Sequence, residues 1–227
     1  MQVVLDNWDQ VVRAFTYTIL LFLISGFLSL IFGTLLAAMR VGPIGVLAKA
    51  GAVYVTIIRN TPLLIVLVFF RIAGPKVGLQ FGFVDIVIGE IRINQLFAAC
   101  IVALTVYTSS FVCEALRSGV NAVSLGQAEA ARAIGLPFGG TMRHVVLPQA
   151  FRASVPPLAS VQIALLKNTT VCGVFGVSEA FFRMKLFTND EPGQRVGIFL
   201  SFALIFVLLV EIVSLFANRL ERRWRIA

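Results

Sequence analysis

The chain has 227 residues, of which 59% are hydrophobic and 13% are charged. Soluble domains carry about 25% charged residues, so the composition excludes a soluble enzyme, a coiled coil, a disordered tail and a nucleic-acid-binding module. The formal net charge of +8 comes from lysines and arginines that stand singly between apolar stretches, and we interpret it as a signal of membrane topology. The 3 cysteines and single histidine form no pattern typical of a disulfide framework or a zinc site, so we expect no metal or cofactor in this chain.

Five apolar stretches follow one another along the chain, and each is long enough to cross a bilayer as a helix. Two of them are interrupted, the second at Arg59 to Pro62 and the fourth at Lys167 and Asn168. No repeat, low-complexity tract or linker divides the sequence. These features predict an all-α integral membrane protein with a single domain over residues 1–227 and five transmembrane helices, at residues 14–39, 50–70, 96–112, 153–177 and 197–217.

The segments between the predicted spans differ in positive charge. With five spans, the N-terminus shares one side of the membrane with residues 71–95 and 178–196, and this side carries seven lysines and arginines. The C-terminal tail shares the other side with residues 40–49 and 113–152, and that side carries ten. Because lysine and arginine accumulate in cytoplasmic loops, we expect a multi-pass membrane protein with its N-terminus outside and its C-terminus in the cytoplasm.

An arginine interrupts the second span. Arg59 lies nine residues into this stretch, and Pro62 disturbs the helical hydrogen bonds, which leaves carbonyl groups free to line a cavity. A charged side chain at membrane depth costs about 2.5–3.5 kcal/mol on insertion scales, so Arg59 is expected to face protein or water. One interpretation places Arg59, Asn60 and Thr61 on a substrate path, where the guanidinium binds a carboxylate. The alternative starts the span at Pro62 and makes Arg59 an anchor at the cytoplasmic interface.

A polar cluster interrupts the fourth span. Lys167 lies 14 residues beyond Ala153, or roughly 21 Å along a helix. It is followed by three polar residues, Asn168, Thr169 and Thr170. These side chains match the carboxylate and ammonium groups of an amino acid, and they would break a regular helix where a binding cavity is needed. The alternative is a set of hydrogen bonds between helices that holds the bundle together.

The inner segment at residues 113–152 predicts two short helices. Ser124 and Gln127 are spaced as in a capping box, and Gly135 is placed to end the first helix. A second short stretch follows and leads to Leu147 and Pro148. Two small helices joined at a glycine would form a compact knob with a flat alanine surface, which suits a partner protein.

The same segment resembles a known motif. Residues 129–131 (EAA), then Gly135 after three residues, then residues 145–148 (VVLP) after nine more, resemble the EAA loop of bacterial ABC importer permeases. Val145 stands where the family often has isoleucine. The resemblance extends over roughly residues 10–220.

Three further stretches resemble motifs of the polar amino-acid uptake (HisMQ-like) subfamily, namely residues 59–63 (RNTPL), 126–131 (GQAEAA) and 166–170 (LKNTT). Residues 107–111 (YTSSF) and 167–170 are most similar to permeases of actinobacterial glutamate-uptake systems. Many relatives have aspartate where this chain has Asn168. Without that acid, and with positive charges at Arg59 and Lys167, the chain is expected to favour acidic or neutral substrates over basic ones.

The resemblance implies the permease of a type I importer with the MetI-like fold, in a bacterial cell membrane. Two permease chains, expected to form a heterodimer, would enclose the path; an ATPase dimer would bind the inner loops, and an extracytoplasmic amino-acid-binding protein would deliver the substrate. ATP and Mg²⁺ would be held by the ATPase, since this chain has no Gly-rich Walker sequence. The implied substrate is a polar amino acid, foremost glutamate, with aspartate or glutamine as alternatives.

These roles can be assigned to individual residues. ATPase coupling is assigned to Gln127, Glu129, Ala130, Ala131, Gly135, Leu147 and Pro148. The substrate path is assigned to Arg59, Asn60, Thr61, Lys167, Asn168, Thr169 and Thr170. The competing function is a structural or regulatory membrane subunit that docks a cytoplasmic partner without forming a path, which would leave Arg59 and Lys167 without a use. A membrane enzyme is not supported, because no span carries a catalytic cluster.

Overall fold

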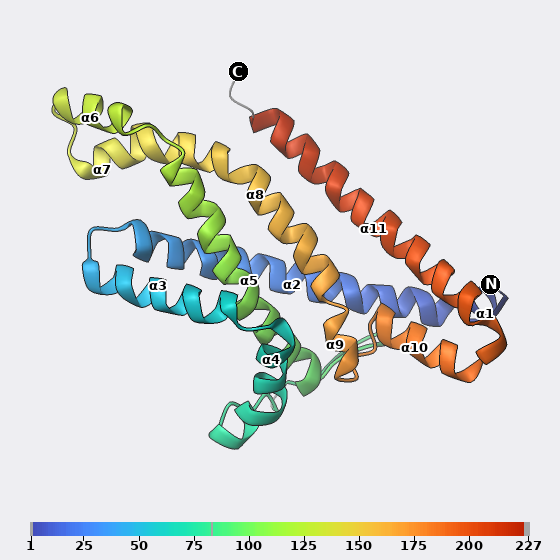
Figure 1. Cartoon of the computed structure of the whole chain (residues 1–227). Coiled ribbons are helices and arrows are strands. Elements are labelled where there is room, and N and C mark those ends of the chain that lie inside the picture. The colour runs from blue at the N-terminus through green and yellow to red at the C-terminus, as the bar shows by residue number, and fades with distance from the viewer. Residues whose placement is uncertain (1, 83, 225–227) are drawn as a thin grey trace.

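A computed structural model describes residues 2–82 and 84–224 of the chain. Long helices form a bundle, and short helices lie at both ends of it (Figure 1). The helices are α1 (Gln2–Asp6), α2 (Trp8–Val41), α3 (Gly45–Asn60), α4 (Leu63–Val68), α5 (Gln95–Asn121), α6 (Leu125–Ala133), α7 (Phe138–Thr141), α8 (Leu147–Asn168), α9 (Val171–Val174), α10 (Ala180–Asp190) and α11 (Arg195–Trp224). Between them lie π- or 3₁₀-helical turns η1 (Phe69–Ala73), η2 (Gly74–Val77), η3 (Met142–Val146) and η4 (Pro192–Gln194), and strands β1 (Ile86–Ile88) and β2 (Ile91–Ile93). Arg225, one of the basic residues counted above, lies outside the described residues.

Helix α2 packs against α5, and the two run in the same direction. Near the start of both helices, the ring of Tyr17 lies 5.8 Å from that of Phe97, measured between centroids. Further along, Gly33 lets the backbones approach closely, since a Cβ at this position would lie 2.5 Å from the Cβ of Val112. Close packing through small residues is the usual way in which helices associate in a membrane. Helix α2 is continuous because its sequence has no proline, and its central part carries no charge.

The interruption predicted in the second span is a sharp break. Helix α3 returns beside α2 and ends at Asn60, after which the chain bends by 104° (Figure 1). Thr61 has extended dihedral angles, and Pro62 has no N–H group to donate, so the helical hydrogen bonds stop here. Helix α4 then buries three apolar side chains, Leu63, Val66 and Leu67. The break therefore separates two helices that pack on different parts of the bundle.

A small hairpin before α5 is a feature that the all-α prediction missed. Strands β1 and β2 pair antiparallel with Ile86 opposite Ile93, and Gly89 supplies the positive φ, +59°, that the tight turn requires. Tyr17 of α2 fixes the hairpin: its hydroxyl donates to the Arg92 carbonyl at 3.3 Å and accepts the Arg92 N–H at 2.8 Å. Each strand has only three residues, which is too short for a period of two to stand out in the sequence.

Helix α8 returns antiparallel to α5, and the two cross closely at Gly119. A Cβ at Gly119 would lie 1.9 Å from the Ser154 Oγ and 2.4 Å from the Ala150 carbonyl oxygen. Helix α8 continues through two consecutive prolines and ends at Asn168, where the sequence predicts an interruption of the fourth span. The core of the bundle thus consists of α2, α5 and α8.

Helices α10 and α11 pack against the first half of α2. The ring of Phe202 on α11 lies 5.9 Å from that of Phe15 on α2 and 6.0 Å from that of Phe187 on α10. On its other side, α11 exposes large apolar residues such as Leu204 and Leu208. A 30-residue helix with such a face has the length and surface of a membrane-spanning segment.

Three described helical stretches are long and apolar enough to cross a membrane, namely α2, α5 and the stretch Pro192–Arg222 that contains α11. The bent pair of α3 and α4 makes a fourth if it counts as one span. The remaining predicted span corresponds to α8, whose sequence includes three prolines, an arginine and a lysine and which does not belong to this set. The helical membrane architecture agrees with the sequence, and the count of five spans stays a prediction.

Candidate functional site

The inner segment contains the short helices that project from one end of the bundle (Figure 1). Helix α5 extends to Asn121, so the first nine residues of the segment 113–152 belong to a long helix. The projection itself comprises α6, α7 and η3, and we call residues 122–146 the knob. Gly135 follows the end of α6 with a φ of +90°, which agrees with its predicted role as a helix terminator.

Most residues assigned to ATPase coupling lie on the surface. The exposed ones are Gln127, Glu129, Ala130, Gly135, Leu147 and Pro148. Ala131 is only 5% exposed and packs inward. Ser124 stands at the N-cap of α6, but its side chain makes no capping hydrogen bond; instead the backbone N–H of Gln127 donates to the Ser124 carbonyl at 3.1 Å. The start of the helix was predicted correctly, and the side-chain part of the capping box was not.

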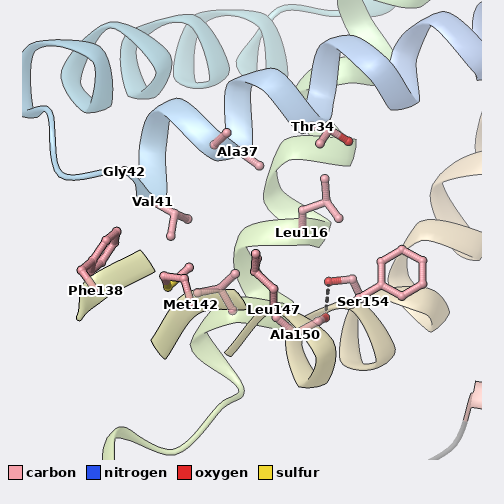
Figure 2. Close-up of a pocket in the computed structure, with 13 residues that line it drawn as sticks. Thr34, Ala37, Val41, Gly42, Leu116, Phe138, Met142, Leu147, Ala150 and Ser154 are labelled. Carbon is pink, nitrogen blue, oxygen red and sulfur yellow. Dashed lines mark hydrogen bonds between the residues drawn. The ribbon is translucent and has the colours of Figure 1, made fainter. Parts of the chain in front are cut away.

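An apolar pocket of about 400 Å³ lies where the knob meets α2, α5 and α8 (Figure 2). Val41, Leu116, Phe138 and Met142 belong to its lining, together with other small or apolar residues. Its two hydroxyl groups, on Thr34 and Ser154, each donate at 2.7 Å to a carbonyl of their own helix. The side chains of the lining therefore offer no free hydrogen-bond donor to a polar amino acid. We call this apolar contact region between the knob and the bundle the seam.

Arg59 lies among four charged residues that we call the Glu114 cluster: Arg40 of α2, Arg59 of α3, and Glu114 and Arg117 of α5. One carboxylate oxygen of Glu114 accepts a hydrogen bond from Arg40. The other lies 3.7 Å from the Arg59 Nη1 and 3.6 Å from the Arg117 Nη1. The Arg59 guanidinium also lies over the ring of Phe111, 5.4 Å from its centroid. Arg59 is thus held against α5, with 42% of its side chain exposed.

Sequence reasoning missed the role of Glu114, because it placed this residue in the inner segment beyond the third span. A signal was available: Glu114 and Arg117 are three residues apart, in a stretch without glycine or proline from Gln95 to Ser118. Their pairing with α2 and α3 could not be found in this way, since Arg40 and Arg59 are distant in sequence.

The second candidate path segment lies at the end of α8. Lys167 is exposed and Asn168 is half-buried, whereas Thr169 is fully buried. The hydroxyls of Thr169 and Thr170 each donate at 2.7 Å to a backbone carbonyl three residues earlier. Lys167 therefore carries the accessible charge of this segment, and the threonine oxygens keep only their capacity to accept hydrogen bonds.

The two path segments adjoin one buried apolar cluster. It includes Leu63, two residues after Thr61, and Leu165, two residues before Lys167. The break between α3 and α4 and the end of α8 thus border the same part of the core, while the side chain of Arg59 turns toward α5.

Glu179 is a buried acid in the segment 178–196, which sequence reasoning placed on the outer side without assigning this residue a role. It lies between α9 and α10, outside the spanning helices, and its side chain is 0% exposed. Its carboxylate caps α10 by accepting the N–H groups of Phe181, at 2.9 Å, and Phe182, at 2.8 Å. Burial raises the pKa of Glu179 to about 8, although these two hydrogen bonds favour the charged form.

Metal-ligating side chains do not gather anywhere in residues 2–82 and 84–224: no group of three or more is found there. The three cysteines, Cys100, Cys113 and Cys172, are free and buried. The candidate site consists of charged and polar groups at the ends of helices.

Comparison with known proteins identifies the kind of molecule to which these features belong. Residues 29–226 match the family described as binding-protein-dependent transport system inner membrane component. The chain belongs to this family. It is accordingly a multi-pass membrane protein and a transport permease subunit, not an enzyme, and ATP hydrolysis in such systems takes place on a separate chain.

Two similar proteins illustrate how far the likeness extends. The glutamate transport system permease protein GluC of Corynebacterium glutamicum is 39% identical over 218 residues, which cover 96% of this chain and 95% of the relative. The probable glutamine ABC transporter permease protein GlnM of Bacillus subtilis is 32% identical over 223 residues, covering 98% and 97% of the two chains. The permease likeness therefore includes both the broken helix and the knob.

Solved structures confirm the fold class. The crystal structure of an amino acid ABC transporter with histidines superposes with a TM-score of 0.84 at 24% identity, covering 98% of this chain and 97% of that one. An inward-facing structure of the MetNI methionine ABC transporter gives a TM-score of 0.73 at 22% identity, covering 96% and 98%. The chain has the MetI-like permease fold, and importers of this class in general pair such a permease with a second permease and with ATPase subunits.

Proposed function

We propose that this permease subunit imports glutamate, with aspartate and glutamine as alternative substrates, in an ATP-driven amino-acid transporter. The main support is the likeness, over nearly the whole chain, to permeases named for glutamate and glutamine transport. The charges at the candidate path add physical support, because Arg59 and Lys167 are both exposed and both positive. An anionic substrate would compensate this charge.

Substrate binding is assigned to Arg59, Asn60 and Thr61 and to the segment from Lys167 to Thr170. Lys167 would bind a carboxylate, and Asn168 offers both a donor and an acceptor. The threonine oxygens can accept from the substrate ammonium group, although Thr169 must first become accessible. A basic amino acid would instead add a third positive charge beside Arg59 and Lys167, at a cost of several kcal/mol in a low-dielectric cavity. Acidic amino acids are therefore expected over basic ones.

Coupling to ATP hydrolysis is assigned to the knob and the start of α8. The exposed residues Gln127, Glu129 and Ala130 on α6 would contact the ATPase subunit directly, and Leu147 and Pro148 would border this contact. Ala131 would fix α6 to the rest of the knob, and Gly135 would set its turn. ATP and Mg²⁺ would bind to the ATPase dimer, and this chain would contribute no ligand to them.

The assembled importer would contain further partners in the bacterial cell membrane. A second, different permease chain would complete the path, and it or the lipid bilayer would cover the exposed apolar face of α11. An extracytoplasmic amino-acid-binding protein would deliver the substrate. The distribution of lysine and arginine supports an N-terminus outside and a C-terminus in the cytoplasm.

Uptake by reconstituted vesicles tests this proposal. Vesicles would carry the chain with its ATPase, its second permease and its binding protein, and uptake of labelled glutamate, glutamine and arginine would be compared. We expect ATP-dependent uptake of glutamate in excess of arginine. Lys167→Ala should lower glutamate uptake by about tenfold or more, since a charge-assisted hydrogen bond contributes about 1.5–3 kcal/mol.

Lys185→Ala, which removes an exposed lysine of α10, is the matched control and should transport normally. Arginine uptake above that of glutamate, or normal glutamate uptake by Lys167→Ala, would refute the charge argument. Complete absence of transport with the ATPase still bound would instead favour a docking subunit without a path.

A further inference from the structure

Glu114 lies on the helix that leads into the knob. Helix α5 runs without interruption to Asn121, so Glu114 stands seven residues, or about 10 Å, before the end of the helix that leads into the knob. A helix transmits displacement along its axis because its backbone hydrogen bonds are continuous. Movement at the base of the knob therefore displaces Glu114 as well.

The two carboxylate oxygens of Glu114 serve different helices. Oε1 accepts a hydrogen bond from Arg40 of α2, whose side chain is 13% exposed and also lies 4.0 Å from the sulfur of Cys113. Oε2 faces Arg59 of α3 at 3.7 Å and Arg117 of α5 at 3.6 Å. The contact with Arg40 is close and buried, whereas the contact with Arg59 is longer and partly exposed. Of the two contacts to other helices, the one with Arg59 is the one that can open.

Helix α3 is fixed to α5 at its middle and held more loosely at its end. At the middle, the Tyr54 hydroxyl lies 2.9 Å from the Val106 carbonyl oxygen and 3.0 Å from the Ser109 Oγ. Near the end, Arg59 reaches α5 through the carboxylate of Glu114 and the ring of Phe111. The 104° break follows two residues later. The position of this break relative to α5 therefore depends on the side chain of Arg59.

The charges of the cluster make this attachment sensitive to Glu114. Three guanidinium groups surround one carboxylate, so the cluster keeps two formal positive charges even when all contacts are made. If the carboxylate were neutralised, Arg59 would face the charges of Arg40 and Arg117 without compensation. Repulsion would then move the end of α3 away from α5.

We propose that Glu114 is a positioning residue that transmits movement of the knob through α5 to the broken end of α3, with Arg59 as the link. The inference rests on the proposed function, because it takes the knob as the ATPase contact and the break as part of the path. It adds the physical connection between these two places. It also gives the positive charge of Arg59 a role in addition to substrate binding, namely its ion pair with Glu114.

A distance measurement across the break tests the inference without using substrate. Spin labels would be attached to cysteines introduced at Ile57 on α3 and Ile65 on α4, both of which are exposed. In the reconstituted complex, trapping the ATPase with ATP and vanadate should change the label-to-label distance. Glu114→Gln should abolish this change, and Glu114→Asp, which keeps the charge, should retain it.

Two further variants separate coupling from simple structural damage. Arg59→Lys leaves the pair of Arg40 and Glu114 in place but loses the planar guanidinium, so it should weaken the link in an otherwise intact cluster. Uptake should fall between about 5- and 150-fold in Glu114→Gln and less in Arg59→Lys, in line with typical coupling energies. Glu90→Gln, which breaks the ion pair between Glu90 in the hairpin turn and Arg13 on α2, is the control and should behave like the parent.

A distance change that persists in Glu114→Gln, or that is absent from the parent, would overturn the inference. The same conclusion holds if Arg59→Lys retains full uptake and the full distance change. If the parent transports no amino acid yet Glu114→Gln still abolishes its nucleotide-dependent distance change, the proposed substrate is wrong and the inference stands.

Discussion

Replacing Glu179 with glutamine should make the stability of this protein less dependent on pH. Glu179 is fully buried between α9 and α10, where its carboxylate accepts the N–H groups of Phe181 and Phe182. Burial raises its pKa to about 8 from an ordinary value of 4.5. Glutamine keeps an oxygen that can cap the helix, and it has no proton to lose.

The sign of the effect follows from proton linkage. Below pH 4.5, the carboxyl is protonated in both the folded and the unfolded state, and it adds no cost to folding. As the pH rises from 4.5 to about 8, the unfolded carboxyl ionises before the folded one, so stability is progressively lost. At about 1.36 kcal/mol for each pKa unit, the loss between about pH 6 and pH 9 amounts to about 2–3 kcal/mol. This corresponds to a fall of about 5–10 °C in the unfolding temperature of a chain of this size.

Thermal unfolding of the purified protein in detergent, followed by circular dichroism across this pH range, measures the effect. The parent should unfold at a lower temperature at the alkaline end, and Glu179→Gln should show a nearly flat profile. Glu191→Gln, an exposed acid at the other end of α10, is the control and should follow the parent. Parallel profiles for the parent and Glu179→Gln would refute the assignment of a raised pKa.

Three other predictions concern packing, coupling and topology. Gly119→Val should destabilise the bundle by about 3 kcal/mol or more in thermal unfolding, because its side chain would overlap the backbone of α8 and overpacking alone costs about 1–3 kcal/mol. The double variant Glu129→Arg and Gly135→Trp should insert normally but abolish substrate-stimulated ATP hydrolysis, since both residues lie on the exposed knob. A cysteine at position 76 should react with an impermeant reagent in intact cells, whereas one at position 125 should not, because the proposed topology places them on opposite sides.

Each of these three predictions has its own control or contradicting outcome. Gly126→Val serves as the packing control, since no atom lies within 4 Å of a Cβ at that site, and equal unfolding of the two variants would contradict the close crossing. Full stimulation of ATP hydrolysis in the double knob variant would show that the knob is not the contact with the ATPase. Labelling at position 125 but not at 76 would reverse the proposed topology.

The long helices were predictable because their sequences are apolar over 16 or more residues, and few structures other than a membrane-spanning helix can accommodate such a run. The two breaks could also be located, since Pro62 removes a hydrogen-bond donor and the polar residues around Asn168 end an apolar run. Gly135 was predictable for a similar local reason, because few other residues adopt its positive φ without strain.

Features that depend on distant residues were not predictable in the same way. Glu114 binds Arg40, which is 74 residues away in the sequence, and no local pattern indicates this pairing. The seam between the knob and the bundle likewise joins α2 to residues more than 90 positions later, such as Phe138. The predicted capping box failed because the backbone N–H of Gln127 bonds to the Ser124 carbonyl, not to its hydroxyl.

The packing of α2 on α5 also bears on the order of events during biosynthesis. Tyr17 and its hairpin partner Arg92 are 75 residues apart, and at about 5–20 residues per second the ribosome needs about 4–15 seconds to make the chain between them. Throughout this time the surface of α2 around Gly33 has no α5 to pack against, so it must rest against lipid or the insertion machinery. The close contact between α2 and α5 can thus form only after α3 and α4 have been synthesised. An error in inserting α3 or α4 would leave the surface of α2 that packs on α5 uncovered in the bilayer, where other proteins could contact it.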